Sequence, residues 1–412
     1  DADGWLRTDA WTAGGTSAAP ECELAVLNAP VVCSNKLIAT IDRCATEDPP
    51  DKADIVHLLQ ARGTDFSEVC RTADSLRETV NGNTVSYVIN RNIHYTNICS
   101  IHCGFCAFSK GNTSAHLRGK PFELDENAIT QQVHDAWNLG VTEICMQGGI
   151  HPAYTGDTYL KLTRLVRQTA PNVHIHAFSP LEVHYGAETL GISLAEYLTA
   201  LKEAGLNSLP GTAAEVLDDD VRNELCPDKI SVARWLEVMR TAHNLGLRST
   251  SSIMFGHIDR YEHWAQHLLH IRQLQVETGG FTEFVPLPFV HMEAPIYLKG
   301  LARRGPTFRE TVLMLAVARL VLHPYITNIQ ASWVKLGRDG WCACLNAGVN
   351  DMGGTLMHEA ITRSAGAVHG QTMTPSTFEA VASSLERVPR QRTTEYGEPS
   401  SERIQTARKQ LY

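Results

Sequence analysis

The fold of this chain is decided by the stretch Cys99-Ser-Ile-His-Cys103-Gly-Phe-Cys106-Ala-Phe. It follows residues 84–98, whose β-branched and aromatic side chains predict a strand. Thiolates are soft ligands that favour iron–sulfur clusters and zinc. Three cysteines at C-x3-C-x2-C spacing can hold three irons of a cubane cluster and leave the fourth iron open to a small molecule. A strand that ends in such a loop predicts a metal centre.

Two simpler explanations of the three cysteines compete with the cluster. A structural zinc site closes with four protein ligands, commonly as two C-x2-C pairs. Cys342 and Cys344 have the wrong spacing for a second pair, although His94 or His102 remains as a fourth ligand. Inert core thiols are the other explanation, but three cysteines within eight positions, beside Gly104, do not resemble core packing. We favour the cluster and keep zinc as the alternative.

The motif resembles that of the radical S-adenosylmethionine (SAM) enzymes, with an aromatic residue, Phe105, before the last cysteine. In that superfamily the open iron chelates the amino and carboxylate groups of SAM. Four longer sequence motifs narrow the resemblance to the tyrosine-using half of FO synthase, which makes the deazaflavin core of coenzyme F420. These motifs are residues 90–97, 103–111, 286–300 and 331–335. The similarity runs from about residue 38 to about residue 396.

This resemblance implies the cofactors, the reaction and the partners. Cys99, Cys103 and Cys106 would ligate a 4Fe-4S cluster, which reduces SAM to give a 5′-deoxyadenosyl radical. The radical would take hydrogen from L-tyrosine, whose Cα–Cβ bond then breaks, and the hydroxybenzyl fragment would join 5-amino-6-(D-ribitylamino)uracil. Further expected partners are a reductant protein and a deazaflavin ring-closing radical SAM enzyme, fused or separate.

Three other functions stay open. A radical SAM enzyme of the futalosine menaquinone pathway and the ring-closing half of FO synthase carry similar cysteine motifs. The motif at residues 286–300 is the sequence feature that distinguishes the tyrosine-using half from these two enzymes. The alternative from a different class is a non-catalytic metal or electron-transfer module. Such a module would not require the many unusual loops that this sequence predicts at strand ends.

Composition limits the class of partner and the compartment. The 412 residues are 43% hydrophobic and 20% charged, as in an ordinary globular protein. A net charge of −9 argues against nucleic acid or an anionic membrane as the main partner, because both attract basic surfaces. No apolar run reaches the length of a membrane span. Eleven scattered cysteines do not form a secreted disulfide framework, so we expect a reducing compartment, cytoplasmic or within an organelle.

The chain divides into four expected parts. Residues 1–35 contain the stretch Gly14-Gly-Thr-Ser-Ala-Ala-Pro20 and show no clear period, which indicates a linker or a processed segment. Because the sequence starts with Asp, we expect either a piece of a fusion with the ring-closing enzyme or a trimmed transit peptide. Apolar residues at helical spacing predict a helical preface at 36–82. A radical SAM barrel with C-terminal helices should occupy 83–396, followed by a tail at 397–412.

Helices and strands alternate after the cysteine loop. The apolar periods predict helices at 126–139, 159–168, 194–204, 232–245, 263–277 and 308–322. They predict strands at 142–147, 174–178, 206–209, 249–255, 281–285 and 328–332, and a last short strand near 343–349. With the strand at 84–98, about eight parallel strands predict an α/β fold: a TIM-type (β/α)8 barrel of the radical SAM kind with an N-terminal helical extension.

Functional residues of such a barrel should lie just after its strands, at the carboxyl-end mouth. Gly148 and Gly149 follow the second strand, and because they lack a Cβ their backbone can approach a ligand closely. In the superfamily a similar glycine pair touches SAM and is often followed by an acidic residue, where this chain has Ile150 and His151. We expect this pair and Phe105 to contact the cofactor.

Five residues after later strands are further candidates. Glu182 and Glu215 are expected to contact SAM or substrate, since a carboxylate at the mouth can bind a ribose hydroxyl or an ammonium. His257, His291 and Lys335 are the candidate catalytic residues that hold tyrosine or its phenolate. A histidine can move a proton and a lysine can bind a carboxylate, although each could equally serve the structure alone.

Overall fold

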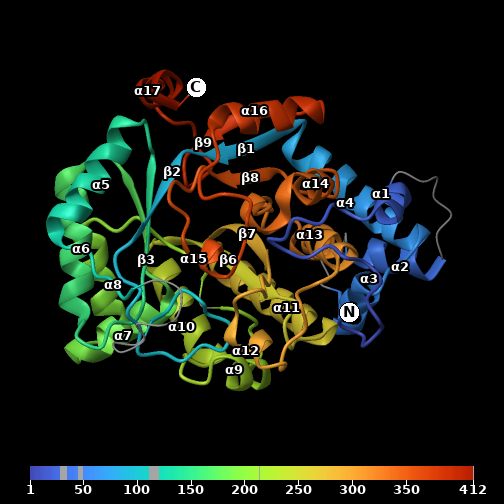
Figure 1. Ribbon diagram of the computed structural model, residues 1–412, viewed down its shortest axis with the longest axis horizontal. Helices are drawn as coiled ribbons and strands as arrows, with labels where there is room; N and C mark the ends of the chain where they lie inside the picture. Colours follow the sequence, from blue (N-terminus) through green and yellow to red (C-terminus); the bar gives the residue numbers. More distant parts are fainter. Residues whose placement is uncertain (28–34, 45–49, 111–119, 213, 412) are drawn as a thin grey trace.

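A curled parallel sheet forms the centre of the molecule (Figure 1). The computed structural model describes residues 1–27, 35–44, 50–110, 120–212 and 214–411. The larger sheet has the order β2-β3-β4-β5-β6-β7, and all its neighbouring strands are parallel. Its strands are β2 (Asn90–His94), β3 (Glu143–Gln147), β4 (His174–Ala177), β5 (Ser208–Leu209), β6 (Arg248–Phe255) and β7 (Phe281–Pro288). A second sheet, β8-β1-β9, contains β1 (Thr84–Val88), β8 (Asp351–Gly354) and β9 (Val388–Arg392).

Isolated bridges connect the two sheets into a ring. Phe284 of β7 pairs with Ile329, and Gln330 pairs with Asp351 at the start of β8. The segment after β8 then accepts a hydrogen bond from the backbone N–H of Asn92 in β2. The strands therefore enclose a common interior, and the predicted α/β fold of the TIM type is confirmed.

Helices cover the outside of this ring (Figure 1). The N-terminal helices are α1 (Glu21–Leu27), α2 (Asn35–Cys44), α3 (Lys52–Leu59) and α4 (Thr64–Asn81). Between the strands lie α5 (Glu126–Asn138), α6 (Gly156–Thr169), α7 (Pro180–Leu190), α8 (Leu194–Ala204), α9 (Asp219–Leu225), α10 (Val232–Asn244), α11 (Tyr261–Thr278), α12 (Pro295–Leu298), α13 (Phe308–Leu322) and α14 (Trp333–Leu345). The C-terminal helices are α15 (Ile361–Ser364), α16 (Pro375–Ser384) and α17 (Ser401–Leu411). No helix in the described ranges is long and apolar enough to cross a membrane.

Helix α13 shows how the N-terminal helices are attached to the barrel. Every residue of α13 is buried, because the helix packs against β7 on one side and against α3 and α4 on the other. A helix that is covered all round is expected to be apolar on every face. Thr307 and Glu310 form a capping box that sets its first turn.

Several predicted strands differ from the structure. The strand predicted at 84–98 breaks into β1 and β2, which belong to different sheets. Residues 328–332 make only single bridges. The strand predicted near 343–349 is wrong, because the chain there ends α14 and continues in a turn. Trp341 is buried in α14, so tertiary packing decides in favour of the helix. Strand β9 is missing from the prediction because its partly exposed, charged residues lack a β-pattern.

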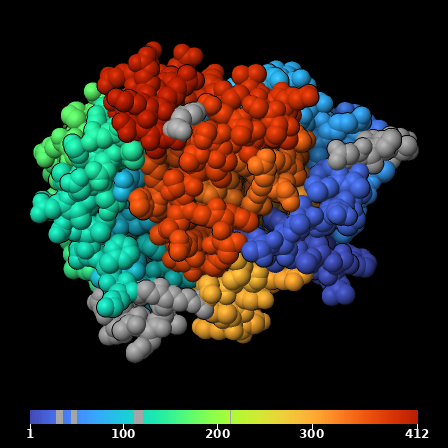
Figure 2. Space-filling view, turned by 45° about the horizontal axis from the view of Figure 1, so that its top comes forward, coloured from blue at the N-terminus to red at the C-terminus, as the bar shows by residue number. Residues whose placement is uncertain are grey.

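The first residues of the chain pack on the barrel, although the sequence predicts a linker or processed segment there. Trp11 is buried, with its ring centroid 5.6 Å from that of Phe308. The N–H of Gly14 donates to the carbonyl of Lys335 at 2.6 Å. Figure 2 shows the N-terminal part of the chain, in blue, against the orange surface of the C-terminal half.

The proposed division of the chain remains a prediction at its other boundaries. Residues 28–34 of the predicted first segment and 45–49 of the helical preface lie outside the described residues. The predicted tail contains α17, whose Arg403 guanidinium lies 3.9 Å from the ring centroid of Trp137 in α5. The end of the chain therefore contacts the helices that surround the barrel.

Candidate active site

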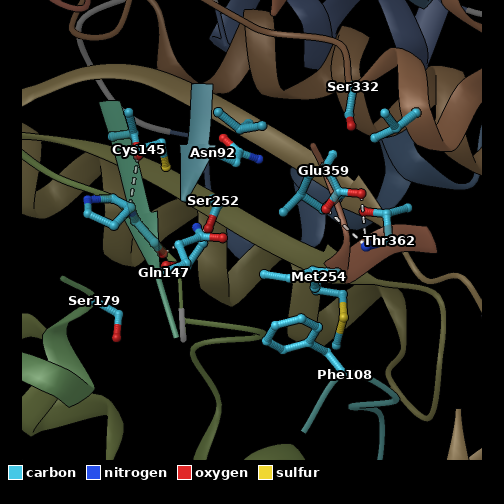
Figure 3. Close-up of a pocket in the computed structure, with 18 of the residues that line it drawn as sticks. Asn92, Phe108, Cys145, Gln147, Ser179, Ser252, Met254, Ser332, Glu359 and Thr362 are labelled. Carbon is cyan, nitrogen blue, oxygen red and sulfur yellow. Dashed lines mark hydrogen bonds between the residues drawn. The ribbon is translucent and has the colours of Figure 1, made fainter. Parts of the chain in front are cut away.

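A cavity of about 410 Å³ extends from the interior of the ring to the loops at the carboxyl ends of the strands. Figure 3 shows part of its lining, with side chains from several strands pointing into one space. The predicted site residues that line it are Cys99, Cys103, Phe105, Cys106, Gly148, Gly149, Glu182, Glu215 and Lys335. The structure thus brings together residues that lie far apart in the sequence.

The cysteine loop is held in place through its glycine. The N–H of Gly104 donates to the carbonyl of Leu225 at 2.8 Å, and the Gly104 carbonyl accepts from the N–H of Ile296 at 2.7 Å. The first of these partners ends α9 and the second begins the short helix α12. Two distant segments therefore support the loop from outside the cavity.

Cys99, Cys103 and Cys106 are free thiols facing the cavity. The N–H of Ile150 donates to Sγ of Cys99 at 3.3 Å, and the N–H of Ser109 donates to Sγ of Cys106 at 3.4 Å. Burial raises the pKa of the Cys99 and Cys103 thiols. Their thiolate forms therefore need a nearby positive charge, which a bound metal supplies.

These residues fit a 4Fe-4S cluster. Three soft thiols lie on one loop, and backbone N–H groups donate to two of their sulfurs, a contact that is typical around iron–sulfur clusters. In the described part of the chain, no group of three His, Cys, Asp or Glu side chains could hold a single metal ion. A cubane has a different requirement, because each cysteine binds its own iron. Cys99, Cys103 and Cys106 would hold this cluster.

The glycine pair allows β3 to approach the cysteine loop. A Cβ at Gly148 would lie 2.3 Å from the ring of Tyr95, and one at Gly149 would lie 2.3 Å from the carbonyl oxygen of Ile98. Neither position has room for a side chain. Packing alone thus requires both glycines, and their backbone lines the cavity where a ligand can approach it closely.

Glu182 lines the cavity, but its oxygens already have partners. It forms the capping box of α7 with Ser179, whose N–H and hydroxyl donate to Oε2 at 2.7 and 2.6 Å. The hydroxyl of Tyr95 donates to Oε1. Burial raises the pKa of Glu182, although these hydrogen bonds act in the opposite direction. Its geometry is that of a residue that starts a helix and holds Tyr95 in place.

Glu215 is paired with a lysine that the sequence analysis did not select. Lys229 Nζ lies 2.5 Å from Oε1 of Glu215 and 4.9 Å from the ring centroid of Phe105. All three side chains line the cavity beside the cysteines. Lys229 lies after α9, which separates it from the end of β5. A search restricted to the residues directly after each strand therefore does not find it.

Lys335 presents a cation to the cavity from the first turn of α14. Burial lowers the pKa of Lys335, and the nearby Glu359 carboxylate opposes that shift. Burial likewise raises the pKa of Glu359, which accepts hydrogen bonds from the N–H of Thr362 at 2.9 and 3.1 Å. A cation and a carboxylate thus line the same cavity. Glu359 lies in a loop without a recognisable motif, so the sequence did not single it out.

Neither His257 nor His291 lines the cavity, so the structure does not place these candidates beside a ligand. His257 is buried, with Nε2 3.0 Å from the Met254 carbonyl and Nδ1 accepting from the N–H of Ile258. The ring of His291 packs at 4.5 Å against that of Tyr297, and burial lowers the pKa of His291 to about 4. A histidine after a strand can turn into the core, and sequence position does not reveal this.

A further set of lining residues lies within the strands. These are polar side chains that point inward from the middle of the barrel: Asn90, Asn92, Glu143, His176, Thr250, Ser252, Glu283 and Gln330. A search of each strand for polar residues at alternate positions could have found several of them.

The comparisons with known proteins identify the class of protein. Residues 93–271 match the family model described as "Radical SAM superfamily", and residues 278–402 match one described as "CofH/MqnC C-terminal region". A solved methylornithine synthase structure matches the fold with a TM-score of 0.65, covering 85% of this chain and 97% of that chain at 18% identity. The chain is a member of the radical SAM superfamily.

Its relatives narrow the family. The chain is 47% identical over 334 residues to the 5-amino-6-(D-ribitylamino)uracil–L-tyrosine 4-hydroxyphenyl transferase of Methanocaldococcus jannaschii, covering 80% of this chain and 91% of that protein. It is 47% identical to the FO synthase of Streptomyces coelicolor, covering 88% of this chain but 42% of that protein. The chain therefore belongs to the family of the Methanocaldococcus transferase, and it spans about two fifths of the length of the FO synthases that it matches.

Proposed function

We propose that the chain is a transferase that breaks the Cα–Cβ bond of L-tyrosine and joins the 4-hydroxybenzyl group to 5-amino-6-(D-ribitylamino)uracil. The observation that carries the proposal is the identity of 47% with the Methanocaldococcus transferase over 91% of that protein. The placement of three free thiols at one cavity supports it. The description of the C-terminal family model names two kinds of protein, so the relatives favour this substrate pair more strongly than that model does.

The chain contributes binding, orientation and shelter to this reaction. When bound, the 4Fe-4S cluster and SAM supply the radical that takes a hydrogen atom from an unactivated position. The backbone of Gly148 and Gly149 lets a cofactor approach β3 closely, with Phe105 and Glu215 on the same wall. Exclusion of water from this cavity when the ligands are bound would protect reactive fragments from side reactions.

Lys335 and Glu359 are the residues that we propose to hold tyrosine. An amino acid is a zwitterion, and a lysine–glutamate pair facing one cavity matches its carboxylate and ammonium. Fixing both charged groups orients the Cα–Cβ bond, and such positioning accounts for a large part of many rate enhancements. His257 and His291 are not part of this proposal, because they lie outside the cavity lining.

Two further partners belong to the proposal. A reductant protein must supply electrons to the cluster, and a deazaflavin ring-closing enzyme, fused or separate, must consume the product. The cysteines whose side chains the structure describes are free thiols, which supports a reducing, cytoplasmic compartment.

Anaerobic reconstitution with iron and sulfide, followed by mass spectrometry of products, tests the function. The reaction contains SAM, dithionite, L-tyrosine and the ribitylaminouracil, with each component omitted in turn. We expect 5′-deoxyadenosine and a hydroxybenzyl–uracil adduct only when both substrates are present with SAM. If 5′-deoxyadenosine forms but no adduct does, the substrate assignment is wrong and the futalosine-type or ring-closing alternative takes its place.

A further inference from the structure

Polar side chains line the middle of this barrel, whereas apolar side chains usually fill the middle of such barrels. In TIM barrels the interior positions are dominated by branched apolar side chains that leave no channel. Here Asn92 of β2 lies opposite Cys145 of β3, and Cys145 lies opposite His176 of β4. Ser252 of β6 contributes to the same wall. Figure 3 shows Asn92, Cys145 and Ser252 facing one space, so short polar side chains leave room for a ligand.

These residues lie deep in the cavity. Gln147 and Met254 also line it, two residues further along β3 and β6 towards the carboxyl ends. Glu283 lies lower still, because its neighbour Phe284 pairs with Ser251. We call Asn92, His176, Ser252 and Glu283 the polar floor; each is at most 7% exposed.

The polar floor keeps unused hydrogen-bonding capacity. Ser252 Oγ donates to the Gly211 carbonyl at 2.8 Å, which leaves its lone pairs as acceptors. His176 Nδ1 lies 2.7 Å from Ser208 Oγ, and its Nε2 has no hydrogen-bond partner among the described residues. Asn92 Oδ1 is buried and, in the described ranges, likewise has no partner. Buried polar atoms of this kind normally find a partner, so they indicate a ligand.

Glu283 supplies an acceptor to this floor. Its Oε2 accepts from Gln330 Nε2 at 2.9 Å and from the Tyr396 hydroxyl at 2.6 Å. Within the described part of the chain, no hydrogen bond reaches its Oε1. Arg392 is held by Asp351 at 2.5 and 3.0 Å and also reaches Glu283 at 3.3 Å, so its charge is already compensated.

The distribution of charged side chains therefore favours different positions for the two substrates in the cavity. Lys335 can take the carboxylate of an amino acid, whereas the polar floor contains no uncompensated cation in its described residues. Its free groups are a serine hydroxyl, a histidine nitrogen, an amide and a carboxylate oxygen. Such a set matches a neutral chain of hydroxyl groups, which both donate and accept hydrogen bonds.

We propose that the polar floor binds the ribityl chain of the aminouracil, with the pyrimidine ring above it towards the cysteines. This inference rests on the proposed function and adds the place and chemistry of the second substrate. In this proposal the specificity residues are Asn92, His176, Ser252 and Glu283. They form hydrogen bonds with the polyol and not with the pyrimidine ring. A substrate without the polyol would leave these buried groups unpaired, which is costly.

Two ligands and two variants test the proposal on the reconstituted protein with SAM. The dissociation constants of the ribitylaminouracil and of 5,6-diaminouracil, which lacks the ribityl chain, are measured by anaerobic calorimetry. We expect wild type to bind the ribityl compound at least about tenfold more tightly, since several hydrogen bonds are lost with the chain. Ser252→Ala and His176→Gln should weaken the ribityl compound about tenfold and the diaminouracil less than about twofold.

His174→Gln is the matched control for His176→Gln. Both histidines lie on β4 with a ring nitrogen 2.7 Å from Ser208 Oγ, but His174 does not line the cavity. The control should bind both uracils as wild type does. The same selective loss in His174→Gln would overturn the direct contact, because the Ser208 network would then carry the effect.

The remaining outcomes separate this inference from the proposed function. Equal affinity of wild type for the two uracils, or equal weakening of both by the variants, overturns the polar floor even if the adduct forms. A selective loss of tyrosine affinity would instead assign the floor to tyrosine and overturn the proposal. If wild type binds the ribityl compound selectively but makes no adduct, the proposed reaction fails while the polyol site stands. The comparison of ligands on wild type needs no variant and holds if a variant fails to fold.

Discussion

The motif cysteines differ from the buried cysteines of this chain in what surrounds them. Cys344 and Cys70 are at most 2% exposed and pack among apolar side chains of the main core. Cys99 and Cys103, by contrast, face a cavity and lie on a loop supported by backbone hydrogen bonds. Structural buried cysteines are inert, whereas the position of Cys99 and Cys103 at a shared cavity fits the ligand role that we propose for them.

Cys103→Ala should abolish cluster loading and SAM cleavage. The variant retains two of the three motif thiols, and the loss of one iron ligand should prevent stable binding. Iron and sulfide content, iron–sulfur absorption and 5′-deoxyadenosine release measure the effect. Cys344→Ala is the control, because it removes a buried thiol that does not line the cavity. Full SAM cleavage by Cys103→Ala would contradict the cluster assignment.

Glu283 should make the stability of the protein depend on pH. Burial raises the pKa of Glu283 to about 6 from its usual 4.5, so the folded state binds this proton more tightly than the unfolded state does. Its contribution to stability is therefore greatest below about pH 4.5 and is lost as the pH rises to about 6. The shift corresponds to roughly 2 kcal/mol.

Urea unfolding of the apo-protein at several pH values, compared with Glu283→Gln, measures this contribution. The advantage of wild type over the variant should shrink by roughly 2 kcal/mol across this range and then stay constant. A difference that grows with pH would show that Arg392 dominates and that the glutamate is ionised throughout.

At the scale of elements, the carboxyl ends of β2 and β3 place the cofactor loop. The N–H of Gly149 donates to the Thr96 carbonyl at 3.0 Å, and the N–H of Ser100 donates to the Ile150 carbonyl at 2.8 Å. These bonds tie the cysteine loop to the end of β3. The two strands therefore act as one support for the three motif cysteines.

Gly149→Ala should displace this loop. The new Cβ would lie 2.3 Å from the Ile98 carbonyl oxygen and 2.8 Å from Cβ of Cys99, so the backbone must shift. We expect a loss of about 1–3 kcal/mol in the free energy of unfolding, typical of overpacking. Cluster content after reconstitution should fall severalfold.

Gly340→Ala is the control for this prediction. Gly340 lies in α14, and its nearest neighbour would be 3.5 Å from the added Cβ, which is an ordinary contact. Alanine also favours a helix over glycine. Unchanged iron content in Gly149→Ala would show that the loop does not depend on close approach to β3.

At the scale of the whole molecule, the N-terminal residues connect the barrel wall to the C-terminal half. Arg7 donates to the carbonyl of Gly305 at 3.1 Å, and Gly14 accepts from the N–H of Val368 at 3.0 Å. Gly14 also lies against Val290, a residue of the cavity lining. The N-terminal segment thus supports, from outside the cavity, the wall that contains Lys335.

Trp11→Ala should destabilise the protein through this segment. Trp11 is 3% exposed and packs edge-on against Phe308 of α13, so its removal leaves a cavity. The expected loss is about 3–5 kcal/mol, measured by urea unfolding. Limited proteolysis should cleave the variant earlier within residues 1–27.

Trp11→Phe keeps an aromatic ring at this position and should lose much less stability. Equal stability of wild type and Trp11→Ala would mean that the N-terminal segment is only loosely attached to the barrel.

Where one local stretch carries the proposed chemistry, sequence reasoning selected residues that the structure places at the cavity. The three motif cysteines and the glycine pair are short local motifs, and both motifs lie at the cavity. It did not anticipate that the ring of His257 turns back to the carbonyl of Met254, or that Lys229 reaches Glu215 from another segment. The strand predicted near 343–349 failed because an apolar run of that length fits either a helix or a strand.

The sequence by itself predicted the three cysteine ligands and established the alternation of strands and helices and the family resemblance. These depend on neighbours along the chain: thiols on one loop, apolar residues at a helical or alternating period. The tertiary structure alone decided which side chains share the cavity. Asn92, His176, Ser252 and Glu283 come from four strands and meet because the sheet curls into a ring. That convergence depends on how the strands pair, which no short stretch of sequence specifies.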